Sequence, residues 1–577
     1  MLSKVSLAGL LQALSVLNIV TATPLIRRNS PSCNTPQNRA CWADGFNVHT
    51  DWEEKTPLTG CIKNSPTITA DWGDWINVTV INKLPANGTS IHWHGIRMLN
   101  NNIHDGVNGV TECPIPPNGT KSYVFRAQQY GTTWYHSHHS SQYGNGVWGP
   151  LVINGPASAN YDVDLGTFPI NDWYYDSADR ILSRLQALNG GAPPASDNIF
   201  FNGTNVNRTD ITKGKYAKVV LTPGLTHRLR LINPSVDYTF TFSIVGHNFT
   251  VISNDLVPLN TTSPNTTVSS IFMGIGQRYD IIIQGKSEEE IAGDPGNGNY
   301  WINATQPTNG VCGNSQNKRP AAILSYDYPN ATDQLPILDG PDPVNLRCED
   351  TTDFRPVVAR DIPRSEFNIS PSNTLSVNLL RDTNRSQVFW TVNNTDLNVM
   401  WEKPILEFVR EGNTSWPDNE NLLEIPSGSH WSFWLIENEL NVPHPLHLHG
   451  HDFVVVSRSP ALDDSVLNDA MTPVRHFDPV RDAPGMGNFT NPTRRDATML
   501  PGKGWLIVAF RNDNPGAWLF HCHIAWHASM GLSVQFLERK NEIKDVMDLD
   551  FIEDNCKAWQ SYIDTNPPWQ PKNDSGI

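Results

Sequence analysis

The sequence is short of positive charge. Its 42 lysine and arginine residues are outnumbered by 58 aspartate and glutamate residues, which gives a formal net charge of −16 over 577 residues. Such a chain repels a phosphate backbone, so we expect no nucleic-acid partner, whereas cations and an acidic working environment fit better. The length predicts two to four domains.

Long apolar runs are also missing beyond the first 22 residues, so no membrane association is expected. Residues 1–22 combine Lys4, an apolar run through Val20 and small residues, which is typical of a secretory signal peptide. Arg27-Arg28 is a possible end of a propeptide reaching residue 28. About sixteen Asn-X-Ser/Thr sites follow, and they predict a secreted, extracellular glycoprotein.

Helical periodicity is scarce as well. Short alternating runs between glycine, proline and asparagine residues predict an all-β chain. Internal comparison finds matching segments in the first and last thirds of the chain, namely 75–82 with 431–438, 92–95 with 447–450, and 134–138 with 519–523. A middle copy is visible where 246–253 matches 450–457. We therefore predict three related all-β units, with boundaries near 157 and 340.

The repeats also indicate which units hold metal. Ser137 stands in the first unit where the third has Cys522, and Gln142 stands where it has His527. In the second unit none of the histidine pairs survives: Phe240, Ser243 and Val245 occupy those positions. Metals are therefore expected in the first and third units, at a shared face.

The segment His521-Cys522-His523 offers ligands on two faces. Successive side chains of a strand point to opposite sides, so the thiol faces one way and both imidazoles face the other. A thiolate with imidazoles suits copper. A single His-X-His is more often an ordinary strand pair, but this chain has four ligand-bearing segments in register across its repeat: 92–94, 136–138, 444–449 and 521–527.

Zinc is the chemical competitor. A set of eight histidines without a carboxylate or a second thiolate suits several redox-active metals better than one tetrahedral ion.

These motifs resemble the multicopper oxidases, and the match is close to the laccases of filamentous ascomycete fungi. The similarity covers nearly all of the chain after residue 33, including residues 105–116, 142–146 and the final Asp574-Ser-Gly-Ile577. It implies three cupredoxin-like Greek-key domains in tandem, spanning 29–157, 158–340 and 341–577 with a C-terminal tail. It also implies a secreted oxidase that couples one-electron oxidation of small phenolic or aromatic substrates to the four-electron reduction of O2 to water.

The resemblance further implies four copper ions and their ligands. The expected ligands are His444, Cys522 and His527 for type 1 copper; His92 and His447 for type 2; His94, His136 and His523 for one type 3 ion; and His138, His449 and His521 for the other. The axial position of the type 1 site is Leu532, which cannot coordinate, whereas nearby Met530 is expected to pack. Loss of a thioether ligand raises the reduction potential, so we expect a medium-to-high value.

Five further expectations concern reactivity. Cys522 should pass electrons from the type 1 site, through its neighbours His521 and His523, to the other three ions. His527 should accept the electron at the substrate edge, and Asp237 matches a pocket carboxylate that takes the phenolic proton. Asp105 matches a carboxylate that helps proton delivery to oxygen. The four-residue tail ending at Ile577 resembles a plug that reaches toward the type 3 ions.

Cysteine count sets one problem. Eight cysteines are present, and if Cys522 binds metal, seven remain. The family pairing is Cys33–Cys41, Cys113–Cys556 and Cys312–Cys348, which leaves Cys61 without a partner. The chain is also shorter than its relatives around 61–65, where they carry strand residues. A missing strand would expose a sheet edge, and we interpret the gap as a truncated gene model, splice variant or natural deletion.

Other functions stay open at this point. Another multicopper oxidase would use Fe(II) or ascorbate as its electron donor, and carboxylates around His444 and His527 would favour iron. A secreted copper-binding protein without turnover is the alternative from a different class. We expect a monomer.

Overall fold

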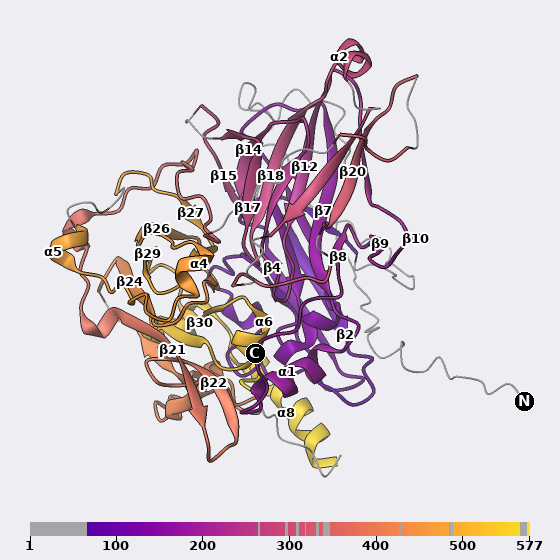
Figure 1. The fold of residues 1–577 in the computed structure, drawn as a ribbon. Coiled ribbons are helices and arrows are strands. Elements are labelled where there is room, and N and C mark those ends of the chain that lie inside the picture. Colours follow the sequence, from indigo (N-terminus) through magenta and orange to yellow (C-terminus); the bar gives the residue numbers. More distant parts are fainter. Residues whose placement is uncertain are drawn as a thin grey trace, which may run out of the picture.

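The computed structural model describes residues 66–577, except 263–265, 295–297, 307–310, 318, 330–333, 339–346, 426–427, 484–485, 487–488 and 566–573. The expected signal peptide, the propeptide, the Cys33–Cys41 pair, Cys61 and the short segment at 61–65 lie outside the described residues, as does the boundary at 340. Strands dominate, and they fall into three groups along the chain (Figure 1). The all-β prediction is confirmed.

The first unit contains a four-stranded sheet in the order β1-β6-β5-β3 and a two-stranded sheet of β2 and β4. Its strands are β1 (Ile68–Asp71), β2 (Trp75–Ile81), β3 (His92–Trp93), β4 (Thr120–Arg126), β5 (Gly131–His136) and β6 (Trp148–Asn154). In β2 the alternate residues Ile76, Val78 and Val80 are buried, as the period-2 pattern predicts.

The second unit contains a five-stranded sheet, β11-β20-β19-β13-β17, and a seven-stranded sheet built on β15-β14-β18-β12-β7-β8, with β16 paired to β14. Its strands are β7 (Val163–Trp173), β8 (Asn198–Phe201), β9 (Val206–Asn207), β10 (Asp210–Gly214), β11 (Lys218–Leu221), β12 (Thr226–Ile232), β13 (Phe240–Ile244), β14 (Phe249–Asn254), β15 (Val257–Pro258), β16 (Thr267–Val268), β17 (Ser270–Met273), β18 (Arg278–Gln284), β19 (Asn299–Thr305) and β20 (Ala321–Tyr326). Helices α1 (Ala178–Gln186) and α2 (Glu288–Gly293) interrupt them.

The third unit contains a six-stranded sheet, β22-β21-β24-β29-β26-β27, and a five-stranded sheet, β23-β31-β30-β25-β28. Its strands are β21 (Thr374–Asp382), β22 (Gln387–Val392), β23 (Leu422–Glu424), β24 (Trp431–Asn438), β25 (His444–Leu448), β26 (Phe453–Arg458), β27 (Arg494–Arg495), β28 (Ala497–Leu500), β29 (Trp505–Arg511), β30 (Gly516–Cys522) and β31 (Ser533–Glu538). Its helices are α3 (Ile405–Glu411), α4 (Asp464–Leu467), α5 (Pro479–Asp482), α6 (Ala525–Ser529), α7 (Ile543–Val546) and α8 (Asp550–Thr565).

One pairing recurs in all three units. In each unit an earlier strand lies parallel to the last strand: β1 with β6, β11 with β20, and β23 with β31. The partner sheet repeats another parallel pair, β7 with β12 and β21 with β24. In the first unit, β2 matches β24 in the repeat but pairs only with β4 among the described residues. One edge of β2 therefore has no strand partner in residues 66–577.

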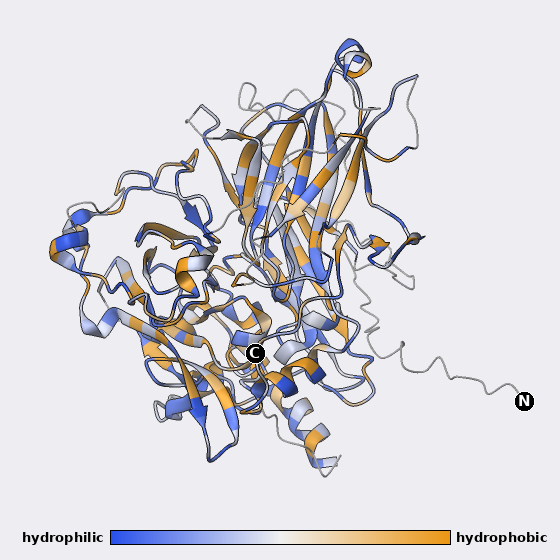
Figure 2. Cartoon of the chain, in the orientation of Figure 1, coloured by the Kyte–Doolittle hydropathy of each residue, from blue (hydrophilic) through white to orange (hydrophobic). Residues whose placement is uncertain are grey.

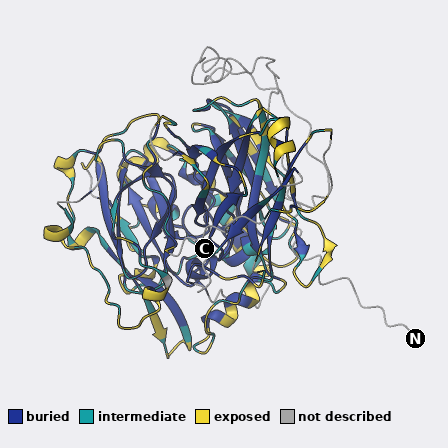
Figure 3. Ribbon diagram, turned by 45° about the horizontal axis from the view of Figure 1, so that its top comes forward, coloured by how far each residue is buried: buried dark blue, intermediate teal, exposed yellow. Residues whose placement is uncertain are grey.

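Apolar side chains fill the space between the sheets. Figure 3 shows the buried strands at the centre of each unit and the exposed residues on loops and short helices. Hydropathy alternates along many strands (Figure 2), so that one face of a sheet meets a core and the other meets solvent or a neighbouring unit. The core of the third unit is continuous with α1 and with the first unit. Ile181 and Leu185 of α1 and Trp134 of the first unit belong to the same apolar cluster as Trp526 of the third. This packing joins the faces on which the histidines lie.

Candidate metal centre

The predicted metal ligands lie on paired strands. His92 of β3 is opposite His136 of β5, and His447 of β25 is opposite His521 of β30. A His-X-His spacing places its two side chains on one face of a strand, so each pair of strands presents a group of imidazoles. The first unit presents one such group and the third presents the other, and both face the interface between these units.

A mononuclear triad forms at one end of β30. The Cys522 sulfur lies 3.5 Å from Nδ1 of His444 and 3.6 Å from Nδ1 of His527, and the two nitrogens are 3.1 Å apart. All three side chains are buried. The three donor atoms face one point from three sides, which is the trigonal two-histidine, one-cysteine arrangement of blue-copper sites.

Burial sets the protonation of this triad. Desolvation lowers the pKa of His444 to about 3, and desolvation together with His444 lowers the pKa of His527 well below its usual value. Both imidazoles are therefore neutral at pH 7 and can donate lone pairs to a metal. Desolvation raises the pKa of the Cys522 thiol, so a metal must displace its proton on binding.

The remaining eight histidines form one cluster on the other face of β30. The eight-histidine cluster consists of His92, His94, His136, His138, His447, His449, His521 and His523, and all are buried. Two contacts join the units by stacking: His92 on His449 and His94 on His447, each with ring centroids 3.8 Å apart. Burial, with repulsion from neighbouring rings, lowers the pKa of seven members, namely His94, His136, His138, His447, His449, His521 and His523. At pH 7 those seven rings are neutral donors.

Several imidazoles in the cluster are oriented by a partner on one nitrogen and have the other nitrogen free for a metal. Nδ1 of His92, His136, His447 and His521 faces a backbone carbonyl at 2.7–3.0 Å. Among the described residues, the opposite nitrogen, Nε2, has no hydrogen-bond partner in His92, His136 and His447, and neither ring nitrogen of His138 has one. A buried nitrogen without a partner is costly unless a metal binds it. The arrangement therefore fits metal ions held by imidazole.

Two aspartates orient histidines across the interface. The backbone carbonyl of Asp105 lies 2.8 Å from Nδ1 of His92, and its carboxylate lies 2.8 Å from Nδ1 of His449. Asp496 mirrors this from the third unit: its carbonyl lies 2.7 Å from Nδ1 of His447, and its carboxylate lies 3.2 Å from Nε2 of His94. Each aspartate thus contacts one histidine of its own unit and one of the other.

The donor set is that of a copper protein. Imidazole suits several transition metals, but a lone thiolate with two imidazoles in a trigonal group is typical of a copper electron-transfer site. Within 66–577, the described residues bring no second thiolate to the triad. The residues present therefore fit copper better than a structural zinc ion.

Asp237 lies beside the segment that carries His527. The carbonyl of its neighbour Val236 accepts a hydrogen bond of 2.9 Å from the backbone N–H of Ala525, at the start of α6. The Asp172 carboxylate accepts the N–H groups of Val236 and Asp237, each at 2.8 Å. Burial, with repulsion from Asp172, raises the pKa of Asp237 well above its usual value. Asp172 is thus a support for the Asp237 loop.

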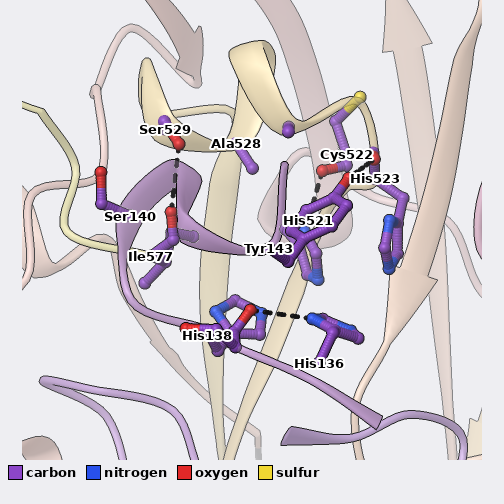
Figure 4. Close-up of a pocket in the computed structure, with 12 residues that line it drawn as sticks. His136, His138, Ser140, Tyr143, His521, Cys522, His523, Ala528, Ser529 and Ile577 are labelled. Atoms are coloured by element: carbon purple, nitrogen blue, oxygen red, sulfur yellow. Dashed lines mark hydrogen bonds between the residues drawn. The ribbon is translucent and has the colours of Figure 1, made fainter. Parts of the chain in front are cut away.

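The carboxyl terminus reaches the cluster. A cavity is lined by His136, His138, His521, Ser140, Ser529 and Ile577, among others. Figure 4 shows Ile577 below Ser529 and on the same side of the cavity as Ser140 and His138. The Ser529 hydroxyl donates to the carbonyl of Ile577 at 3.3 Å, and Ile577 is 2% exposed. The last residues of the chain therefore close one side of this cavity.

Two of the expected disulfides are present. Cys113 is bonded to Cys556 of α8, and Cys312 is bonded to Cys348. Cys522 has a free thiol. The first bridge ties the first unit to the last helix, and the second lies in the apolar cluster that contains Leu467 and Met499.

Three residues that support the site, Asp496, Arg278 and Asp172, were not predicted from the sequence. Asp496 follows Arg494-Arg495, and its only signal in the sequence is this run of three charged residues. The residue that it contacts, His94, lies 402 positions earlier. Arg278 and Asp172 lie in strands β18 and β7, each of which holds a second charged residue, so nothing in their sequence context marks them as site residues.

The comparisons with known proteins give one family. Models of the multicopper oxidase family match residues 63–158, 164–329 and 377–542. A laccase from Neurospora crassa is 47% identical, with 94% of this chain and 89% of the relative covered. Laccase-1 from Melanocarpus albomyces is also 47% identical, with 96% and 90% covered.

Solved structures agree. The crystal structure of a laccase from Botrytis aclada matches with a TM-score of 0.77 at 38% identity, covering 89% of both chains. Fet3p, a multicopper oxidase that functions in iron import, matches with a TM-score of 0.73 at 24% identity, covering 88% of this chain and 91% of that one. The second match supports the fold alone. The three-unit, cupredoxin-like architecture is thereby established.

In the described residues, no helix is long and apolar enough to span a membrane.

Proposed function

The chain belongs to the multicopper oxidase family, and from this premise we propose that it acts outside the cell, as a monomer, on small phenolic or aromatic substrates. Its activity is that of a laccase, an oxidase that consumes O2. Four copper ions held by its residues would supply one-electron redox chemistry, which would couple single-electron oxidation of the substrate to the four-electron reduction of O2 to water.

The predicted ligands divide into one group for each copper ion. The mononuclear triad would hold the type 1 ion, and His92 with His447 would hold the type 2 ion. The type 3 pair would lie on His94, His136 and His523 and on His138, His449 and His521. The short distances within each group support this division, because the His94 Nδ1 and His523 Nε2 atoms are 3.2 Å apart, as are the Nε2 atoms of His449 and His521.

One observation carries the proposal. Cys522 directs its sulfur to the mononuclear triad, while its chain neighbours His521 and His523 direct their rings to the eight-histidine cluster. A covalent path of a few bonds therefore links the two groups of donors. Electrons can cross from one to the other without leaving the protein.

The other residues manage protons and access. Asp237 would accept the phenolic proton, because a phenol is hard to oxidise while it keeps that proton. His527 would form the edge at which the substrate gives its electron. Asp105 contacts His92 and His449 and would help to deliver protons to oxygen. The tail ending at Ile577 would limit access to the cluster.

The test is replacement of the sulfur. Cys522→Ser removes the thiolate while the strand and the histidines remain, so we expect loss of the visible thiolate band and of phenol-dependent O2 uptake. Copper should still be present at the eight-histidine cluster, as measured by metal analysis. A colourless wild-type protein with a full copper content, or a serine variant that still turns over, would disprove the proposal.

A copper-storage role makes a different prediction. A storage protein would bind copper and show the thiolate band but consume no O2 with a simple phenol. Oxygen consumption and copper content, measured on the same wild-type sample, therefore separate the two functions.

A further inference from the structure

The second unit supplies no histidine to the eight-histidine cluster, yet its backbone lies against it. The turn between β17 and β18 places Gly276 at a φ of +84°, and a Cβ there would lie 3.0 Å from His94 Cε1 and 3.0 Å from His523 Cδ2. Only a glycine fits such a close approach at this φ. The backbone of this turn therefore packs against one imidazole from each of the other two units.

Arg278 begins β18 directly after this turn. Its guanidinium makes two parallel bonds to the Asp496 carboxylate, Nη1 to Oδ1 at 2.6 Å and Nη2 to Oδ2 at 2.7 Å. It also donates to the carbonyl of Gly276 at 2.9 Å and to the carbonyl of Thr132 at 3.3 Å. The side chain is 0% exposed. One arginine thus contacts backbone of the first unit and a carboxylate of the third.

Asp496 in turn contacts two histidines of the cluster. Its Oδ1 lies 3.2 Å from Nε2 of His94, and its carbonyl lies 2.7 Å from Nδ1 of His447. The two rings are stacked, with their planes 11° apart. Because a two-point arginine pair fixes the plane of a carboxylate, Asp496 is held at one orientation relative to both rings. Gly95 leaves the room for this pair, since a Cβ at that position would collide with Asp496 and with Arg278.

The charges around Arg278 are balanced within the fold. Asp255 accepts the Arg278 backbone N–H at 3.0 Å and lies 3.6 Å from Nη1. Arg495 pairs with Asp255 at 3.1 Å and with Asp350 at 3.1 Å. Removing Arg278 would leave the buried Asp496 carboxylate without its bidentate partner, and such a group rotates or takes up a proton.

We propose that Arg278 is a positioning residue of the trinuclear copper site: through Asp496, the unit that carries no ligand fixes the orientation of His94 and His447. The inference rests on the proposed assignment of these histidines to the type 3 and type 2 ions. An arginine that only held the units together would affect both copper sites when replaced. Replacing Arg278 should instead weaken the trinuclear site and leave the mononuclear triad unchanged.

The main experiment compares Arg278→Gln with wild type as purified, copper-loaded full-length protein. We expect the type 1 absorption band at full strength and the copper affinity of the trinuclear site about 10- to 100-fold weaker, as is typical when an outer partner of a ligand is lost. The type 2 signal in electron paramagnetic resonance, followed during titration with a chelator, reports that affinity. Arg278→Lys keeps the positive charge but not the bidentate geometry. Its copper affinity at the trinuclear site should lie between those of wild type and Arg278→Gln.

Arg228→Gln is the matched control. Arg228 is likewise buried, lies in β12 of the same unit and pairs with Asp280, but in the described part of the chain it makes no hydrogen bond or ion pair with the eight histidines. It should therefore keep wild-type type 2 copper even if its melting temperature falls. If Arg228→Gln lost type 2 copper as readily as Arg278→Gln, the effect would be general destabilisation and the inference would be wrong.

A double-variant cycle tests the route through Asp496. If Arg278 acts through that carboxylate, Asp496→Asn should weaken the same site, and the double variant should be no worse than the more affected single variant. Additive losses, or a normal type 2 signal in Arg278→Gln, would overturn the inference. Should Arg278→Gln fail to fold, as judged by absence of the type 1 band, Arg278→Lys and Asp496→Asn decide the matter alone.

The outcome is separable from failure of the proposed function. A wild-type protein that binds no copper or lacks the thiolate band would refute the copper assignment itself. A wild-type protein with four copper ions and an unaffected Arg278→Gln variant would refute only the role of Arg278.

Discussion

Single residues of the proposed site would act either as donor atoms for a metal or as a carboxylate that accepts a proton. Cys522 and His527 are buried donors, whereas Asp237 is a buried carboxylate whose pKa is raised by burial and by Asp172. Leu532, 2% exposed, donates its backbone N–H to the carbonyl of His527, so it sits beside the mononuclear triad with an inert side chain. These residues give two predictions at this scale.

Asp237→Asn should impair phenol oxidation selectively. Asp237 is a base only when ionised, and its raised pKa means that ionisation, and with it phenol oxidation, increases as pH rises through that value. The variant should lose on the order of 100-fold in kcat/KM for a phenol and also lose this acidic limb. A non-phenolic electron donor is the control and should react at the wild-type rate. Equal loss on both donors would remove the role of Asp237.

Leu532→Met should lower the reduction potential of the type 1 site. A thioether at the axial position stabilises Cu(II) relative to Cu(I), which leucine cannot do. Redox titration of the visible band measures the change. Met530→Leu is the matched control, and because Met530 is expected only to pack, its potential should stay at the wild-type value. A shift in Met530→Leu instead of Leu532→Met would place the axial position at the wrong residue.

Elements position these residues from distant parts of the chain. Helix α8 is bound to the first unit by the Cys113–Cys556 bridge and by a hydrogen bond from Tyr562 to the carbonyl of Ala86. The tail beyond it is anchored again, because Ser575 bonds to the carbonyls of Ala528 and Ser529, each at 2.8 Å. The last four residues are thus fastened to α6, the helix that carries His527.

Deletion of residues 574–577 should change both access and stability. Removing Ile577 exposes the cavity beside His138 and gives up the burial of one large apolar side chain, about 2 kcal/mol. We expect an altered rate of O2 uptake and a lower melting temperature. Ile577→Val keeps the carboxylate in place and should alter the rate little. Unchanged O2 uptake after deletion would show that the tail does not limit access.

At the scale of the whole molecule, the metal site is an interface. The rings of His92 and His94 stack on His449 and His447, so ions bound there are shared by the first and third units. The unfolded chain has no such site, and any ligand that binds only the folded state stabilises it.

Removal of copper should therefore lower the melting temperature. A site filled at a thousand times its dissociation constant contributes about 4 kcal/mol, so dialysis against a chelator should destabilise the protein by several degrees or more. Adding Cu(II) or Cu(I) should restore the original transition. Mg2+, which prefers oxygen ligands, is the control and should restore nothing. A melting temperature independent of copper would contradict a shared site.

Much of this architecture could be predicted from the sequence because it is local or repeated. The alternation in Trp75–Ile81 and its copy at Trp431–Asn438 are strands β2 and β24, as the pattern indicates. The His-X-His pairs meet because their spacing fixes their face. One edge of β2 has no strand partner among the described residues, and the strand expected to be missing near 61–65 stays a prediction.

The rest depends on contacts that no local pattern encodes. Asp496 and His94 are far apart in sequence, and their meeting depends on how two units pack. Helix α8 was not expected, because its 16 residues are largely polar and its buried side chains, Ile552 and Trp559, are seven positions apart. Such a helix owes its place to tertiary packing more than to its own periodicity.

The reciprocal arrangement of Asp105 and Asp496 has a consequence for biosynthesis. A growing polypeptide emerges amino end first, so the early imidazoles wait for partners that are translated hundreds of codons later. Until then His94 lacks the carboxylate that steers it, and His92 lacks the ring on which it stacks. Copper delivered to a partly synthesised chain would therefore meet an incomplete set of ligands. We expect metal insertion to follow completion of the polypeptide.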